Sequence, residues 1–357
     1  MRTDTHRNGA AAALRAPHLL LGLALPLAAA CDAPVARDVA PSAIVVVDDA
    51  GDTLRLDAPA TRIVSIVPAQ TEILLALGTG DRIIARTDFD TQPELAHLPS
   101  TGNGLTPNVE WIAARRPDLV ISWADAQSRS VVARLSALGI PAYASSVETI
   151  SDMVHSVERL GALTGRAAAA DSIVRGIRDT LAAVERDVAR RTRPRVMYAI
   201  GVDPLMVAGP GTFVHEALTI AGGDNVFDDT RARWPVVSIE EVIRRDPDVI
   251  VVGLGRTRAE ADSLIARLSD TPGWRELRAV REARIHWADP YRFNRPSPDI
   301  GGNARRLAAM LVEGGPAGPA GPSGPAGRTA GTTAGSGAAR PAGPDGPAGP
   351  DSPSPRR

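Results

Sequence analysis

The residue types that perform catalysis are present in this chain, but not at the spacings that such chemistry needs. Gly209-Pro210-Gly211 lacks the Lys-Ser/Thr pair of a phosphate-binding loop, so it predicts a turn. Asp88 and Asp90 lie two residues apart in a polar segment, which is typical of solvated charge. The six histidines contain no H-E-x-x-H pair, and His215 is more typical of a helix surface than of a metal ligand. We therefore expect no catalytic residue, no metal site and no resident cofactor.

The only cysteine, Cys31, is a candidate for lipid modification. Basic residues precede the apolar run Leu19–Ala30, which is too short to span the roughly 30 Å hydrocarbon core of a bilayer. The run is typical of a signal peptide, and Leu27-Ala28-Ala29-Ala30-Cys31 resembles the lipobox at which bacterial lipoproteins are acylated. We expect residues 1–30 to be removed and a lipid on Cys31 to anchor an exported protein to the cell membrane. The alternative is an ordinary secretory signal followed by an incidental free cysteine.

The composition limits the classes of function. Lys and Arg together number 40 against 41 Asp and Glu, and this balance excludes a generally basic nucleic-acid binder. A hydrophobic share of 44% is enough for a core. Residues 314–357 differ from the rest, because their Gly-Pro-Ala triplets are too few and too interrupted for a collagen helix. This segment predicts a disordered tail.

Short apolar strands alternate with amphipathic helices through the middle of the chain. Asp49-Ala50-Gly51-Asp52 first predicts a hairpin between two short strands. Further strands are expected at Arg62–Val67, Leu119–Ser122, Ala142–Ala144, Arg195–Ile200, Val249–Val252 and Arg284–Trp287. Helices are expected at Thr71–Leu77, Val109–Arg115, Val131–Leu138, Val214–Ala221, Ile239–Arg245 and Ala259–Leu268. Such alternation implies parallel sheets covered by helices.

An internal repeat divides this region into two lobes. Val109–Ile121 aligns without gaps on Ile239–Val251, and each copy is a helix, a Pro-Asp turn and a buried strand. Between the copies, apolar residues recur at helical spacing, with a break at Thr164-Gly165 and a long helix from Asp171 to Arg191. The predicted fold is α/β, with two Rossmann-like lobes joined by a long bridging helix. The expected parts are a tether at 31–42, a lobe at 43–150, a bridging segment at 151–192 and a second lobe at 193–313.

Four short segments and the lobe organisation together resemble one known family. The segments are Arg62–Glu72, Pro117–Trp123, Trp234–Glu240 and Arg295–Pro298. With the export signal, they resemble the substrate-binding proteins of ABC importers, in the helical-backbone class that binds cobalamin, ferric siderophores or haem. The last two segments are closest to the cobalamin-binding members. One departure is the loop Ser100–Gly104, which lacks the tryptophan that those members have there.

The resemblance implies a cobalamin ligand in a shallow apolar cleft between the lobes. Burial of a flat macrocycle on aromatic walls contributes roughly 25 cal/mol per Å². The implied walls are Trp123 and Trp234, with Met206 and Phe89 as further packing residues. Arg295, together with Asp289, would hydrogen-bond the polar rim of the ligand.

The resemblance also implies a partner, an ABC permease dimer. Glu110 and Glu240 occupy equivalent positions at the starts of the repeated helices, where one glutamate per lobe would pair with permease arginines. The helix dipole alone also favours a carboxylate there. We expect a periplasmic, lipid-anchored monomer. One alternative is a ferric siderophore or haem bound by the same fold, with arginines such as Arg231 and Arg233 meeting an anionic chelate. The other is an exported, lipid-anchored hydrolase on the same scaffold.

Overall fold

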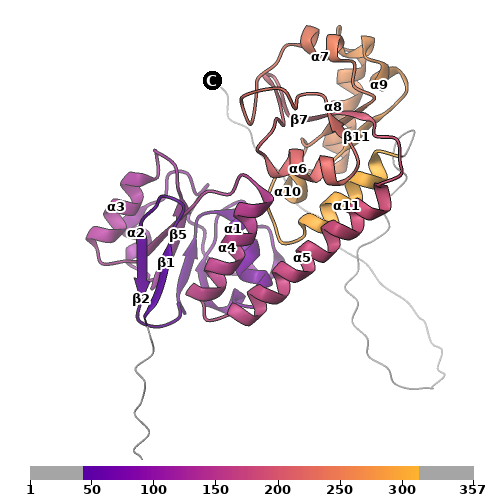
Figure 1. Ribbon diagram of the computed structural model, residues 1–357. Helices are drawn as coiled ribbons and strands as arrows, with labels where there is room; N and C mark the ends of the chain where they lie inside the picture. The colour runs from indigo at the N-terminus through magenta and orange to yellow at the C-terminus, as the bar shows by residue number, and fades with distance from the viewer. Residues whose placement is uncertain (1–42, 313–357) are drawn as a thin grey trace, which may run out of the picture. The chain divides into compact units, whose positions relative to one another are not determined.

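The computed structural model describes residues 43–312, which form two compact units (Figure 1). The first unit comprises the described residues up to Val147 together with Val154–Val174. The second comprises Glu148–Met153 and the described residues from Arg175 onward. The predicted signal peptide, Cys31, the tether and the predicted tail lie outside the described residues. Within residues 43–312, no helix is long and apolar enough to cross a membrane.

The first unit is built on a parallel sheet with strand order β4-β3-β5-β6. Its strands are β3 (Ile63–Ser65), β4 (Ile83–Ala85), β5 (Leu119–Trp123) and β6 (Ala142–Ser145). Val64 and Val120 pack in one apolar cluster with α2 (Val109–Ala113) and α3 (Arg129–Ala137). The sheet confirms the predicted parallel strands, and the interval between β3 and β5 contains β4, which the sequence did not predict.

An antiparallel hairpin, predicted from its turn sequence, adjoins this sheet. It consists of β1 (Ile44–Val47) and β2 (Thr53–Leu56). The Asp48 carboxylate closes the turn by accepting the backbone N–H groups of Ala50 at 3.0 Å and Asp52 at 2.9 Å. The same carboxylate accepts the N–H of Ala144 at 3.1 Å. Asp48 therefore fixes the hairpin against the edge strand β6.

The second unit contains a mixed sheet with strand order β11-β10-β7-β8, and β9 pairs with the start of β7. Its strands are β7 (Arg195–Val202), β8 (Leu205–Val207), β9 (Asp224–Asn225), β10 (Val249–Val252) and β11 (Ile285–Trp287). Only β8 runs antiparallel to its neighbour among these described strands. The core includes side chains from α7 (Ile239–Arg245), α8 (Arg258–Asp270) and α9 (Arg278–Arg281). Helices α6 (Phe213–Ile220) and α11 (Ile300–Met310) pack on each other.

The internal repeat folds in the same way in both units. In the first, α2 leads through Arg116 to β5, and in the second, α7 leads through Asp246 to β10. Arg116 and Asp246 are aligned in the repeat, and both have a left-handed backbone, with φ of 50° and 41°. This conformation is uncommon for residues other than glycine. Its presence at both aligned positions confirms the repeat.

The aspartates of the two Pro-Asp turns make matching hydrogen bonds. Asp118 accepts the backbone N–H of Arg62 at 2.8 Å, just before β3. Asp248 accepts the backbone N–H of Arg195 at 2.8 Å, at the first residue of β7. The guanidinium groups of Arg62 and Arg195 donate in turn to main-chain carbonyls at the ends of α2 and α7. Each unit thus ties its repeat to its first sheet strand with the same residue types.

The helical segment between the repeats consists of α4 (Ile150–Leu163) and α5 (Ala167–Val188). The break between them confirms the one predicted at Thr164-Gly165, where Gly165 has a φ of +67°. The division between the two units falls within α5, between Val174 and Arg175. The long helix therefore contributes residues to both units.

Several helices differ from the sequence-based expectation, and among them the short helices α9 and α10 (Pro290–Phe293) were not predicted. α1 (Pro68–Ala76) begins at Pro68, three residues before the predicted start, because the fixed φ of proline suits the first turn of a helix. α11 was not predicted, since Gly301 and Gly302 weaken the helical signal of its first turn. A Cβ at Gly301 would lie 2.7 Å from the Thr180 side chain. Glycine there allows α11 to approach α5 closely.

Candidate ligand-binding site

In the first unit, two loops display apolar side chains beyond the ends of strands. Phe89 follows β4 and is 37% exposed, and Leu105 precedes α2 and is 53% exposed. Gly104 lies against the backbone that follows β3, because a Cβ at this residue would be 2.5 Å from the carbonyl oxygen of Ile66. Its φ of +76° also favours glycine. The backbone therefore fixes where Leu105 is displayed.

The loop that holds Phe89 is organised by a buried carboxylate. Asp90 is 2% exposed, and its Oδ2 accepts the backbone N–H of Thr87 at 2.7 Å and the hydroxyl of the same residue at 2.8 Å. The backbone N–H of Asp88 donates to the carbonyl of Gly102 at 2.9 Å, which joins this loop to the one before Leu105. The interpretation of Asp90 as solvated charge was wrong, because this side chain closes a turn.

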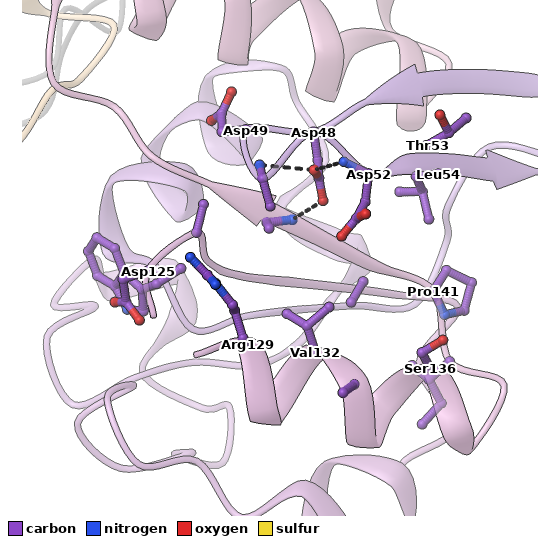
Figure 2. Close-up of a pocket in the computed structure, with 17 residues that line it drawn as sticks. Asp48, Asp49, Asp52, Thr53, Leu54, Asp125, Arg129, Val132, Ser136 and Pro141 are labelled. Carbon is purple, nitrogen blue, oxygen red and sulfur yellow. Dashed lines mark hydrogen bonds between the residues drawn. The ribbon is translucent and has the colours of Figure 1, made fainter. Parts of the chain in front are cut away.

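Trp123 ends β5 and is one of the residues that line a cavity of about 680 Å³ within the first unit. Figure 2 shows this cavity. The hairpin, the end of β5, β6 and α3 supply its walls, with Leu54, Val132 and Pro141 among the apolar lining residues. Figure 2 shows Arg129 extending from the start of α3 toward the turn that Asp48 closes. The indole N–H of Trp123 is buried without a hydrogen-bond partner among the described residues. The Trp123 side chain as a whole is half-buried.

In the second unit, Trp234 is half-buried beside other apolar residues. Its ring meets Phe213 edge to face, with centroids 6.5 Å apart and an interplanar angle of 66°. Met206, in β8, forms an antiparallel bridge with Val236, which is 60% exposed. The structure therefore places the predicted residues Met206 and Trp234 on neighbouring segments and adds Val236 to them.

The segment with the predicted residues Asp289 and Arg295 is anchored to β7 and to the residue that follows β10. Asn294 accepts the hydroxyl of Tyr198 at 2.8 Å and donates to a main-chain carbonyl just after β10 at 2.8 Å. Burial, with the nearby Asp289 carboxylate, raises the pKa of the Tyr198 phenol, which stays a protonated donor. Asp289 caps α10 (Pro290–Phe293) by accepting the N–H of Tyr291 at 2.9 Å, and the Arg295 guanidinium lies 4.9 Å from the centre of the Tyr291 ring.

Glu110 and Glu240 lie in the first turns of α2 and α7, as the repeat predicts. Both side chains are exposed, and Glu110 forms an ion pair with Arg134 of α3. A hydrogen bond from its own backbone N–H, and then Arg134, lower the pKa of Glu110. The pKa of Glu240 is lowered by its own backbone N–H and by the Ser238 hydroxyl. Both groups are therefore carboxylates at neutral pH.

His215 lies in α6 with its Nδ1 3.1 Å from the amide nitrogen of Asn225. Its ring is half-buried, which is compatible with the predicted helix-surface position. Within residues 43–312, no group of three or more His, Cys, Asp or Glu side chains is placed to hold a metal ion.

The sequence profile of one protein family covers most of both units. The profile, described as periplasmic binding protein, matches residues 63–291. The chain belongs to this family. Membership identifies a solute-binding protein and not an enzyme, so the hydrolase alternative is set aside. The periplasmic location of the family agrees with the predicted export.

Individual relatives agree with this assignment. The vitamin B12-binding protein of Vibrio parahaemolyticus is 30% identical over 241 residues, which cover 67% of this chain and 85% of the relative. That of Salmonella typhimurium is 32% identical over 194 residues, covering 54% of this chain and 72% of the relative. Among solved structures, the periplasmic vitamin B12 binding protein of Vibrio cholerae matches with a TM-score of 0.61 and 28% identity, covering 71% of this chain and 97% of that one. The periplasmic heme-binding protein of Roseiflexus matches with a TM-score of 0.63 and 26% identity, covering 71% and 98%.

Two apolar residues of the site region were missed by the sequence reasoning. Leu105 and Val236 are the exposed members of these loops, at 53% and 60%. For Leu105, the sequence signal was a large apolar residue beside glycine in a polar loop. For Val236, the signal was its position directly after Trp234-Pro235. Neither signal separates an exposed residue from a buried one.

Proposed function

We propose that this protein binds cobalamin and delivers it to an ABC permease. The observation that supports the ligand most directly is the apolar group formed by half-buried Trp234 and Met206 with exposed Val236 in the second unit, in a chain about 30% identical to vitamin B12-binding proteins. The first unit adds the exposed loop residues Phe89 and Leu105, and half-buried Trp123 at the end of β5.

The chemistry of a corrinoid suits such surfaces. The macrocycle is broad and flat, and its burial on apolar side chains contributes roughly 25 cal/mol per Å². Its rim bears amides, which accept and donate hydrogen bonds. Arg295 is the predicted rim donor, and it lies in the segment that Asn294 anchors to β7 and to the residue that follows β10. Anchoring reduces the entropy that the segment would lose when a ligand binds.

A ferric siderophore or haem is the second candidate, and specific observations favour it. Arg231 and Arg233 are exposed and lie just before Trp234 in the sequence. Neither forms an ion pair within the described residues. Such guanidinium groups attract an anionic chelate. A ferric hydroxamate transport protein of Saccharomonospora viridis is a structural neighbour at 25% identity and a TM-score of 0.62.

Equilibrium dialysis of the purified protein against three coloured ligands tests this function. The ligands are cyanocobalamin, a ferric hydroxamate and haem, each read by its own absorbance. We expect saturable retention of cyanocobalamin at one molecule per chain and weaker retention of the other two. Preferential retention of the hydroxamate or of haem would move the assignment to the second candidate.

Delivery is proposed to use the two glutamates of the repeat. Glu110 and Glu240 are exposed carboxylates on equivalent helices, which suits a permease with two equivalent arginine-bearing subunits. The double change Glu110→Ala and Glu240→Ala should leave ligand affinity intact and abolish uptake into proteoliposomes. Normal uptake by the double variant would refute the docking role.

Anchoring is proposed to use a lipid on Cys31, the only cysteine of the chain. Its position after an apolar run and small residues supports this, and a lipid would keep the protein near its permease. Intact-mass measurement of the mature protein should show acyl groups on Cys31. A mature chain with an unmodified Cys31 would contradict the proposal.

A further inference from the structure

The two docking glutamates differ in one respect that the repeat does not predict. Glu110 is paired with Arg134, and the two side chains are 72% and 55% exposed. Glu240 forms no ion pair among the described residues, because the nearby Arg244 pairs with Glu241. At the same position of the repeat, the glutamate carboxylate of the first unit is therefore already ion-paired within the protein. The glutamate carboxylate of the second unit forms no ion pair within the described residues.

The helix ends themselves do not account for this difference. Asn108 caps α2 by accepting the N–H of Trp111 at 2.9 Å, and Ser238 caps α7 by accepting the N–H of Glu241 at 3.3 Å. Each glutamate also accepts a hydrogen bond from its own backbone N–H. The distinguishing group is the Arg134 guanidinium, which α3 places beside the first turn of α2.

We propose that Arg134 competes with the permease for the Glu110 carboxylate, so that Glu240 is the first of the two glutamates to bind a permease arginine. The inference rests on the proposed docking function. A guanidinium of the partner has to displace Arg134 before it binds Glu110, whereas it binds Glu240 without displacing an internal cation. Arg134 is thus a residue that sets the strength and the order of docking without contacting the ligand.

The expected size of the effect follows from the exposure of the pair. Ion pairs between exposed side chains change an equilibrium by about 1.5- to 5-fold. The change Arg134→Gln should therefore strengthen docking through Glu110 by a factor of about two to five. The matched control is Arg258→Gln, which removes an exposed guanidinium paired with Asp262 at 2.8 Å in the other unit. That control should leave docking unchanged.

The competition can be measured without the permease, by carbon NMR of the glutamate side-chain carboxyl groups in the full chain. The probe is N-acetyl-arginine amide, added stepwise to the wild type and to Arg134→Gln. We expect the Glu240 signal to shift at lower probe concentration than the Glu110 signal in the wild type, and the two to respond alike in Arg134→Gln. The pKa of Glu110 should also rise in the variant, while that of Glu240 stays constant. Equal responses of the two glutamates in the wild type, or an unchanged Glu110 in the variant, would overturn the inference.

A second measurement uses the partner itself. The affinity of wild type, Arg134→Gln and Arg258→Gln for the cognate permease in lipid nanodiscs should rank Arg134→Gln first by about two- to fivefold, with the other two equal. Weaker binding of Arg134→Gln would overturn the inference, because it would make Arg134 a contact of the permease. No cobalamin is present in either experiment, so a wrong ligand assignment does not affect them. Failure of the docking role appears separately, as normal uptake by the Glu110→Ala and Glu240→Ala double variant.

Discussion

The two units use matching hydrogen bonds to hold their repeats, yet they display different side chains in their loops. Asp118 and Asp248 each accept a strand N–H at 2.8 Å. By contrast, their loops carry exposed Phe89 and Leu105 in the first unit, and exposed Val236 close to Trp234 in the second. The repeat thus determines the backbone of each unit, and single loop residues determine which apolar side chains each unit exposes. Substitutions in the repeat backbone contacts and in the loop side chains should therefore have different effects.

The largest expected effect is on the aromatic surface of the second unit. Trp234→Ala should weaken cobalamin binding by about 2–4 kcal/mol, as truncation of a central aromatic does. Trp123→Ala should cost about 1 kcal/mol, because Trp123 lines a cavity within its own unit and its indole N–H is buried. Calorimetric titration of both variants checks the order. Equal losses would show that the two units share the ligand evenly.

The next effect concerns the glycine that positions Leu105. Gly104→Ala should destabilise the protein by about 2–3 kcal/mol, since a Cβ there would lie 2.5 Å from the Ile66 carbonyl oxygen. Gly102→Ala is the control, because it has a similar φ of +86° but open space around the Cβ. It should cost about 1 kcal/mol. Chemical denaturation measures both, and similar losses would remove the close approach as the cause.

The repeat itself should respond alike in both units. Asp118→Ala and Asp248→Ala should each lower the free energy of unfolding by about 2 kcal/mol, because each leaves a strand N–H without its charged acceptor. Asp171→Ala, at an exposed position of α5, serves as the control and should change stability by less than about 0.5 kcal/mol. A loss confined to one of the two units would show that the repeat is not equivalent in energy.

The smallest effect belongs to the exposed aliphatic residues. Leu105→Ala and Val236→Ala should each weaken cobalamin binding by about 1 kcal/mol and leave stability unchanged, since both side chains are more than half exposed in the unliganded protein. Dialysis and thermal unfolding of the two variants check this. An unchanged affinity for one variant would remove that residue from the ligand surface.

The sequence predicted the backbone of the two units better than the side chains that they expose. Short buried strands such as Val249–Val252 and the paired Pro-Asp turns have strong local signals, so the α/β fold and the repeat were predictable. Asp90 was misread because its burial depends on a hydrogen bond to Thr87 and on the loop that covers it. The exposure of Leu105 and Val236 depends on tertiary packing, which apolar character alone does not reveal.

Calorimetric titration of the purified protein with cyanocobalamin tests the central claim most directly. The account predicts saturable binding of one cobalamin per chain, with affinity reduced by about 2–4 kcal/mol in Trp234→Ala. Absence of heat and of saturation with folded wild-type protein, under conditions in which a ferric hydroxamate or haem binds, would contradict it.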